Sequence, residues 1–187
     1  MAPTTPTFNV NAAITAAATI TTRQFRAADH AAVLTLFQEG MLAYADHSSN
    51  AGTLAYIQRS METDLADIPG VFILPGGNFW VATMAGSSSG EPEVVGMVAL
   101  EKKTDGAGEL RRMSVKKEAR RFGVGKLLVM ELEQWAKQNG FDEVTLTTGE
   151  VMTVAQEFYR SVGYTQQETI VVYEDPYYAD VRFTKQL

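Results

Sequence analysis

The 187-residue sequence contains no cysteine and only two histidines, His30 and His47. The absence of cysteine excludes disulfide bonds, thiolate zinc sites and a thiol nucleophile. Two histidines are too few for a histidine-rich metal site. We therefore expect no bound metal, and a chemistry that depends on carboxylates, hydroxyls, cationic side chains and backbone groups.

Basic residues are also in the minority, since 16 Lys and Arg stand against 22 Asp and Glu, for a formal net charge of -6. Nucleic-acid-binding domains usually carry a basic face, so this charge argues against a nucleic-acid partner. No apolar run approaches the ~20 residues that span a bilayer. Residues 1–20 contain neither Lys nor Arg, which secretory and mitochondrial signals require. We expect a cytoplasmic protein with no membrane partner.

The rest of the composition is that of a globular protein, 45% hydrophobic and 20% charged, and the length fits one compact domain. The first residues are rich in Ala and Thr. We interpret residues 1–19 as a flexible N-terminal extension and residues 20–187 as a single domain.

Hydrophobic periodicity predicts a mixed α/β fold around one sheet, with the element order β-α-α-β-β-β-α-β-α-β-β. Asp29 is expected to cap the first helix, and Pro69 to end the second. The unit over residues 109–148 is expected to be a parallel strand–helix–strand crossover. The predicted strands are 19–25, 78–86, 93–102, 109–115, 143–148, 168–174 and 180–187; the predicted helices are 30–45, 53–68, 123–140 and 153–163.

The segment RRFGVGK, residues 120–126, lies between a predicted strand and a predicted helix. The first N–H groups of a helix are unpaired, and the helix dipole adds positive charge there. Glycines allow a ligand to approach the backbone, and Arg120, Arg121 and Lys126 add formal charge. The segment therefore favours a phosphate-bearing ligand, although an ordinary tight turn explains a lone Gly-x-Gly equally well.

Two common phosphate motifs fail on this segment. A Walker A loop requires Gly where Arg120 stands and Ser or Thr where Leu127 stands. The dinucleotide fingerprint requires a third glycine where Leu128 stands, and an early strand–helix–strand unit. The pattern that fits is Arg-x-x-Gly-x-Gly, formed by Arg120, Gly123 and Gly125.

That pattern resembles the pyrophosphate-binding turn of the GNAT superfamily of N-acetyltransferases. Downstream, VAQEFYRSVGY resembles the superfamily signature A-x-x-x-Tyr-x-x-x-Gly-Phe, with Ala155, Tyr159, Gly163 and Tyr164 at its positions. The segments LRRMSV and RRFGVGKLL are similar to the sequences of the subgroup around the camello and N-acetyltransferase 8 proteins.

The resemblance implies the acyl-CoA N-acyltransferase fold, acetyl-CoA as cofactor and a primary amine as acceptor. It implies that the fourth and fifth strands splay apart beyond residues 113–115 and hold the pantetheine arm between them. The implied cofactor-binding residues are Met113, Ser114, Val115, Arg120, Arg121, Phe122, Gly123, Val124, Gly125 and Lys126.

The resemblance also implies that Tyr159 protonates the departing thiolate, although an aromatic residue at helical spacing is also compatible with packing alone. Glu109 is a candidate base, since an amine must lose a proton before it attacks; a solvated strand end is the alternative. Glu150 and Glu101 are rival bases. Two departures weaken a direct transfer of mechanism: Met152 stands where many members have asparagine, and Thr147 where a related group has glutamate.

Two other functions remain open, namely a non-catalytic acyl-CoA-binding module and a phosphate-binding nucleotide module.

The cluster YEDPYY, residues 173–178, suits a cationic amine through charge and cation–π contact, or is an ordinary strand connection. An exposed edge strand is compatible with a homodimer. Candidate residues for the acceptor site are Tyr44, Asp46, His47, Tyr56, Tyr173, Tyr177 and Tyr178.

Overall fold

The computed structural model describes residues 19–43, 51–85, 92–103, 106–174 and 177–187. The predicted N-terminal extension therefore lies outside the described residues, except for Thr19, which opens the first strand. No helix among the described residues is long and apolar enough to cross a membrane.

The described elements follow the predicted order, with three short helical turns added. They are β1 (Thr19–Gln24), the 3-10 turn η1 (Ala27–Asp29), α1 (His30–Leu42), α2 (Ala51–Glu62), the π-helical turn η2 (Pro69–Ile73), β2 (Asn78–Ala85), β3 (Glu93–Lys102), β4 (Ala107–Val115), the 3-10 helix η3 (Lys117–Phe122), α3 (Val124–Gln138), β5 (Glu143–Gly149), α4 (Thr153–Ser161), β6 (Thr165–Glu174) and β7 (Tyr177–Gln186). The mixed α/β prediction is confirmed.

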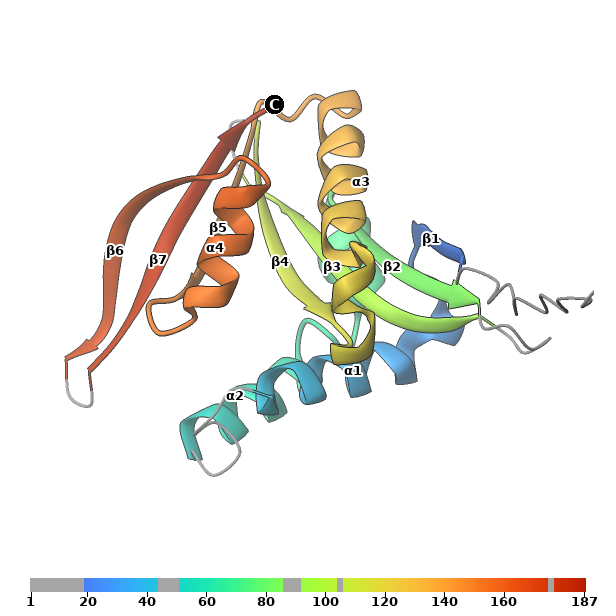
Figure 1. Cartoon of the computed structure of the whole chain (residues 1–187), viewed down its shortest axis with the longest axis horizontal. Coiled ribbons are helices and arrows are strands. Elements are labelled where there is room, and N and C mark those ends of the chain that lie inside the picture. Colours follow the sequence, from blue (N-terminus) through green and yellow to red (C-terminus); the bar gives the residue numbers. More distant parts are fainter. Residues whose placement is uncertain (1–18, 44–50, 86–91, 104–105, 175–176) are drawn as a thin grey trace, which may run out of the picture.

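One seven-stranded sheet in the order β1-β2-β3-β4-β5-β7-β6 forms the centre of the molecule (Figure 1). All neighbouring strands are antiparallel except β4 and β5, which are parallel and joined through α3. The predicted parallel crossover is therefore confirmed.

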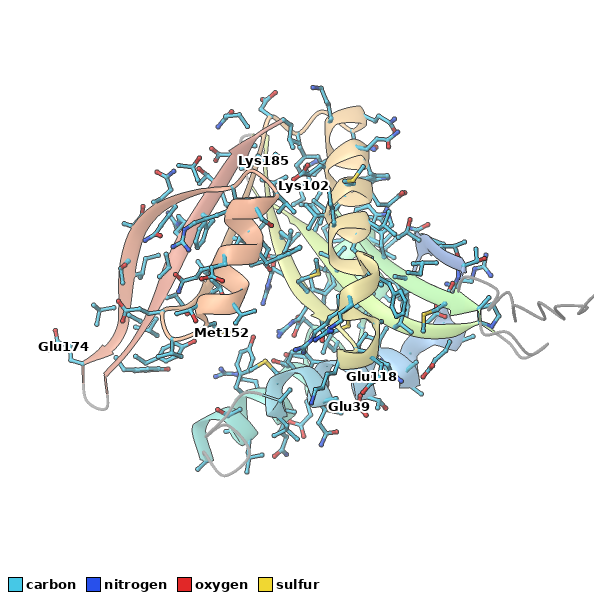
Figure 2. All side chains as sticks on the ribbon, in the orientation of Figure 1. Glu39, Lys102, Glu118, Met152, Glu174 and Lys185 are labelled. Atoms are coloured by element: carbon cyan, nitrogen blue, oxygen red, sulfur yellow. The ribbon has the colours of Figure 1, made fainter. Side chains whose placement is uncertain are left out.

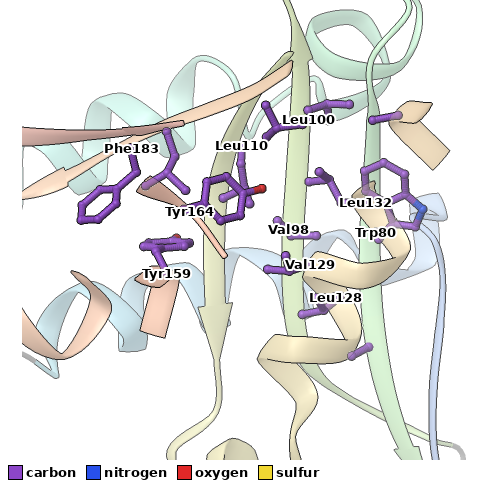
Figure 3. Close-up of a cluster of buried hydrophobic side chains, with 14 of the residues drawn as sticks. Trp80, Val98, Leu100, Leu110, Leu128, Val129, Leu132, Tyr159, Tyr164 and Phe183 are labelled. Carbon is purple, nitrogen blue, oxygen red and sulfur yellow. The ribbon is translucent and has the colours of Figure 1, made fainter. Parts of the chain in front are cut away.

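The sheet separates two hydrophobic cores. Leu100 of β3 packs in the core that α3 and α4 cover, and its neighbour Ala99 packs in the core that α1 and α2 cover. Because successive residues of a strand point to opposite faces, the two cores lie on opposite faces of the sheet. Figure 3 shows part of the first core, with Trp80, Leu128 and Leu132 packed together.

One predicted cap and one predicted helix end were wrong, although α1 begins at His30 as predicted. Asp29 does not cap α1 with its side chain; its carboxylate accepts two hydrogen bonds from Arg23, at 2.6 and 2.7 Å, and one from the Arg26 N–H at 2.8 Å. The backbone of Asp29 is helical, whereas an N-cap residue is usually extended.

The second helix ends at Glu62 rather than at Pro69. The Leu65 N–H reaches back to the Ser60 carbonyl at 3.0 Å, which closes the helix early. Pro69 instead opens η2, where its missing N–H costs nothing because first-turn N–H groups have no helical partner.

Candidate functional site

The parallel pairing of β4 and β5 is short. It covers only residues 107–109 of β4 and 143–145 of β5. Beyond that point β4 stays paired with β3 as far as Val115, and β5 stays paired with β7 as far as Gly149. Residues 110–115 and 146–149 therefore face each other without a shared ladder, and we call this region the open seam. It begins directly after Glu109, several residues earlier than predicted.

A bulge in β4 lies in the open seam. In the β3 register, Ala99 opposes Arg111 and Met97 opposes Ser114, so β4 contains one extra residue over this stretch. Arg112 has a φ of 54°, in the left-handed region that non-glycine residues rarely adopt. A bulge redirects backbone groups away from the regular ladder. The sequence contained a signal for it that we missed: Arg111 and Arg112 side by side break the strand's alternation.

The glycine turn stands at the end of β4. Arg120, Arg121 and Phe122 form the last turn of η3, and all three are exposed. Gly123, at a φ of 74°, reverses the chain into α3, and open space surrounds the position where a side chain would start. This turn therefore exposes cationic side chains and backbone together.

The first turn of α3 supplies unpaired donors. The helical hydrogen bonds begin with the Leu127 N–H to the Gly123 carbonyl, at 3.1 Å, so the preceding N–H groups have no carbonyl one turn earlier. Val124 is fully buried, which leaves only its backbone for a ligand. Gly125 lies against the Phe158 ring and Met113, where an added Cβ would stand 3.2 Å from the ring. The site fits a phosphate group at this helix N-terminus.

A cavity of about 350 Å³ adjoins the turn. It lies between α1 and the end of β4, and its lining residues include Glu39 and Glu118, whose positions on α1 and η3 are labelled in Figure 2. The Ser114 hydroxyl donates to the Leu36 carbonyl at 3.2 Å, and Arg120 Nε donates to the Val115 carbonyl at 3.1 Å. These bonds hold the end of β4 against α1 and the turn.

Tyr159 lies in the core that α4 closes. It is 7% exposed, and its ring packs against those of Phe158, Tyr164 and Phe183 at centroid distances of 5.3, 5.9 and 6.2 Å (Figure 3). The neighbouring Tyr164 hydroxyl is buried without a hydrogen-bond partner among the described residues, and burial beside Glu133 raises the pKa of Tyr164 far above its usual range. Two buried tyrosines thus stand side by side, and only Tyr159 carries a predicted chemical role.

Glu109 is the last residue of β4 that pairs with β5, opposite Thr145, so it stands at the apex of the open seam. Its carboxylate pairs with Lys103 at 2.7 Å, and Lys103 also pairs with Glu101 at 2.7 Å. Glu101 further accepts a hydrogen bond from Arg111. Burial alone would raise the pKa of Glu101, but the hydrogen bonds from Lys103 and Arg111 hold that pKa below its usual value. Glu101 is thereby committed to its ionised form.

Glu150 follows β5 and is exposed, and its backbone carbonyl accepts a hydrogen bond from Gln156 at 2.8 Å. Gln156 is buried and also donates to the Gly149 carbonyl at 3.2 Å, so it ties α4 to the end of β5. Met152, at the foot of α4, accepts a weak hydrogen bond from Thr148 at 3.7 Å (Figure 2). Gln156 was missed in the sequence, where a glutamine inside a helix carries no distinctive signal.

The acceptor-site candidates are only partly described. Tyr44, Asp46 and His47 lie outside the described residues, as does the side chain of Tyr177. Tyr173 and Tyr178 face each other at 6.4 Å between ring centroids. The Tyr178 hydroxyl donates to Asp180 at 3.0 Å.

Burial and the Asp180 carboxylate raise the pKa of Tyr178 to about 12. The hydroxyl of Tyr56, on α2, accepts a hydrogen bond from Arg112 at 2.8 Å. Arg112 also forms a bidentate pair with Asp64. The sequence did not predict this pair.

The chain is similar to known acetyltransferases in sequence. The family model described as "Acetyltransferase (GNAT) family" matches residues 41–164. The N-acetylaspartate synthetase of Danio rerio is 36% identical over 113 residues, which cover 59% of this chain and 38% of that protein. The N-acetyltransferase family 8 member 2 of Rattus norvegicus is 34% identical over 114 residues, 58% of this chain and 48% of that protein. The chain thus spans less than half the length of these two relatives.

Solved structures share the fold over most of the chain. A GNAT-family acetyltransferase from Staphylococcus aureus covers 90% of this chain and 99% of its own, with a TM-score of 0.70 and 18% identity. The PaiA N-acetyltransferase from Thermoplasma acidophilum, solved in complex with coenzyme A, covers 90% of this chain and 99% of its own, with a TM-score of 0.66 and 20% identity.

Proposed function

Because the chain belongs to the acetyltransferase (GNAT) family, we propose that it transfers the acetyl group of acetyl-CoA to a primary amine by direct attack in a ternary complex. The observation that carries this proposal is the open seam between β4 and β5, which ends at the N-terminus of α3. A pantetheine arm paired with the free strand edges would direct its pyrophosphate to the Gly123 turn. Several neighbours of the same fold are named as acetyltransferases, and two were solved with acetyl-CoA or CoA.

When bound, acetyl-CoA supplies an activated thioester. The residues of the chain then have five tasks. Arg120, Arg121 and the first N–H groups of α3 hold the pyrophosphate, with Met113, Ser114 and Val115 along the pantetheine. A backbone N–H at the β4 bulge donates to the thioester oxygen, where negative charge develops. Glu109 would accept one proton of the acceptor ammonium, through water, before the amine attacks and the C–N bond forms. As the C–S bond then breaks, Tyr159 would donate its proton to sulfur, and the second proton that the nitrogen loses would restore the Tyr159 hydroxyl.

We propose a small amino acid as the acceptor class. The support comes from the name of the N-acetylaspartate synthetases, which are proteins that form an N-acetylated amino acid. A network of ion pairs at the start of the open seam offers charges of both signs, from Glu101, Glu109, Lys103 and Arg111. Both signs suit an acceptor that carries an ammonium and a carboxylate.

A panel of amino acids tests the proposal, with thiol release from acetyl-CoA as the signal. The chain contains no cysteine, so the thiol reagent reports only free CoA. The matched variants are Tyr159→Phe and Tyr164→Phe, each of which removes one hydroxyl from the same aromatic cluster. Loss of the general acid should lower kcat by ~10²–10⁴-fold in Y159F, with CoA affinity unchanged. Y164F should keep the wild-type kcat.

The second candidate function is a non-catalytic acyl-CoA-binding module. The burial of Tyr159 and the ion pair that occupies Glu109 favour it. Wild-type protein that binds CoA but releases no thiol with any acceptor would support this module and exclude the transferase. Equal kcat values in Y159F and Y164F would exclude Tyr159 as the acid while leaving transfer intact.

The single-domain boundary at residue 20, the cytoplasmic location, the absence of nucleic-acid and membrane partners and the homodimer stay predictions that rest on composition and pattern. None of them enters the mechanism above.

A further inference from the structure

We infer that Asp64 is a positioning residue for acyl transfer: through its buried pair with Arg112 it holds the bulge of β4 in the geometry that the reaction needs. The inference rests on the proposed function. Asp64 lies after α2 and not on the sheet, and it reaches the open seam through its two hydrogen bonds to Arg112 and through its charge, which also acts on Arg111.

The backbone of Arg112 needs such support. Its φ of 54° places a long side chain in the left-handed region. A non-glycine residue held there costs roughly 1–3 kcal/mol and persists only where the surroundings hold it. The strain lies at the extra residue of the bulge, next to the backbone groups that leave the β3 register. Relaxation of Arg112 toward an extended conformation would rotate the adjacent peptide groups.

The Arg112 side chain is fixed on all its edges. Its Nε donates to Asp64 Oδ2 at 2.6 Å and its Nη2 to Asp64 Oδ1 at 2.7 Å. Its Nη1 donates to the Tyr56 hydroxyl at 2.8 Å. The guanidinium also lies 4.9 Å from the Phe37 ring centroid. The two side chains of the ion pair are 6% and 10% exposed, so the pair is poorly screened and removal of one partner leaves a buried charge.

These contacts join three elements to one strained residue. Phe37 belongs to α1, Tyr56 to α2 and Asp64 to the turn that follows α2. All three lie on the face of the sheet that α1 and α2 cover, and Tyr56 is itself a candidate residue of the acceptor site. The elements that hold the bulge, namely α1, α2 and the turn after α2, therefore also include a candidate residue of the acceptor site. A shift of these elements would also shift the bulge.

The chain offers a matched control in Arg23 and Asp29. This is a second bidentate pair, with distances of 2.6 and 2.7 Å and an aspartate side chain that is 7% exposed. It joins β1 to the start of α1, away from the open seam. Asp64→Asn and Asp29→Asn each remove one negative charge and one acceptor oxygen from a bidentate pair, with Asp64 bound by Nε and Nη2 of its arginine and Asp29 by Nη1 and Nη2.

We expect D64N to lower kcat by roughly tenfold to a hundredfold, which is the cost of misplacing a catalytic group by about 1 Å, while the KM for acetyl-CoA stays within about threefold. D29N should keep the wild-type kcat, although both variants lose stability to urea. Backbone hydrogen exchange should accelerate over residues 110–115 in D64N and not in D29N. Equal kcat values in the two variants, or unchanged exchange in D64N, would overturn the inference.

A second pair of variants separates position from charge. Glycine adopts a positive φ without strain, and alanine does not. If Arg112 matters for its backbone, D64N/R112G should keep a higher kcat than D64N/R112A. Equal loss in both double variants would show that the left-handed backbone of residue 112 does not limit the reaction, which contradicts a positioning role for Asp64. Wild-type protein that releases no thiol under the same conditions would refute the proposed function instead.

Discussion

Gly123 and Gly140 make the strongest test of the proposed cofactor site, because they form a matched pair at the two ends of α3. Their φ values are 74° and 80°, and neither has a neighbouring atom within 4 Å of the position that a Cβ would take. The helix between them has 15 residues, about 22 Å at 1.5 Å per residue. Alanine at either site therefore meets no clash and pays only the left-handed strain, about 1–2 kcal/mol.

The two variants should differ only in ligand binding. Gly123→Ala disturbs the turn whose N–H groups are proposed to hold the pyrophosphate, whereas Gly140→Ala lies at the far end of the helix. A hydrogen bond to a charged group is worth about 1.5–3 kcal/mol, and every 1.4 kcal/mol is about tenfold in affinity. We therefore expect G123A to weaken CoA binding by roughly 10- to 100-fold and G140A to leave it unchanged. Calorimetric titration measures the affinity, and urea unfolding checks that both variants lose similar stability.

CoA binding by G123A as tight as that of the wild type would refute the proposed cofactor site, because the turn would then serve only the backbone. Equal weakening of binding in both variants would also refute it, because a general loosening of α3 would then explain the effect. If both variants weaken CoA binding equally, their free energies of unfolding in urea should also be equal. Unequal free energies of unfolding would instead indicate that one variant is misfolded.

Two further predictions concern carboxylates. Glu109→Gln should lower kcat by ~10²–10⁴-fold, as expected for loss of a general base. Glu101→Gln should change kcat by only a few-fold, since hydrogen bonds from Lys103 and Arg111 occupy the Glu101 carboxylate. A larger loss of kcat in E101Q than in E109Q would reverse the assignment. The hydrogen bonds from Arg23 lower the pKa of Asp29, so its stabilising effect should be fully present above the unfolded value of about 3.9 and disappear as the pH falls through the lower folded value. The difference in unfolding free energy between wild type and D29N should then be constant from pH 5 to 8 and shrink below about pH 4; a difference that grows in acid would contradict this.

Local patterns were sufficient for the elements of the fold. The stripe Val124, Leu128, Leu132 and Trp135 predicts α3. The first three side chains are fully buried, and Trp135 packs against the same core while partly buried. The glycine turn was also predictable, because glycine is the residue that most easily adopts a left-handed conformation. Gly123 adopts that conformation directly before α3. In each case, residues a few positions apart determine the conformation.

The features that were not predicted depend on residues far apart in the sequence. Asp64 was assigned to the interior of a helix, but its carboxylate pairs with Arg112, 48 positions away. Asp29 has the residue type of a cap and is instead bound by Arg23 of β1. The point where β4 leaves β5 depends on their other partners, β3 and β7, and no local pattern encodes it. The extent of the open seam was therefore not predictable from the sequence, whereas the Arg111–Arg112 doublet did indicate an irregularity in β4.

The short ladder between β4 and β5 makes the molecule a pair of half-sheets. One half contains β1–β4 and the other β5–β7, and only three register pairs join them in the sheet. A ligand that lies along both free edges would then complete the sheet as a missing strand does. In such a protein, the concentration of the ligand affects the folding equilibrium, because a ligand that binds only the native state stabilises it. At 100 times its Kd, the ligand adds about 2.7 kcal/mol to the stability of the native state. The supply of ligand would set the rigidity of the seam between the half-sheets.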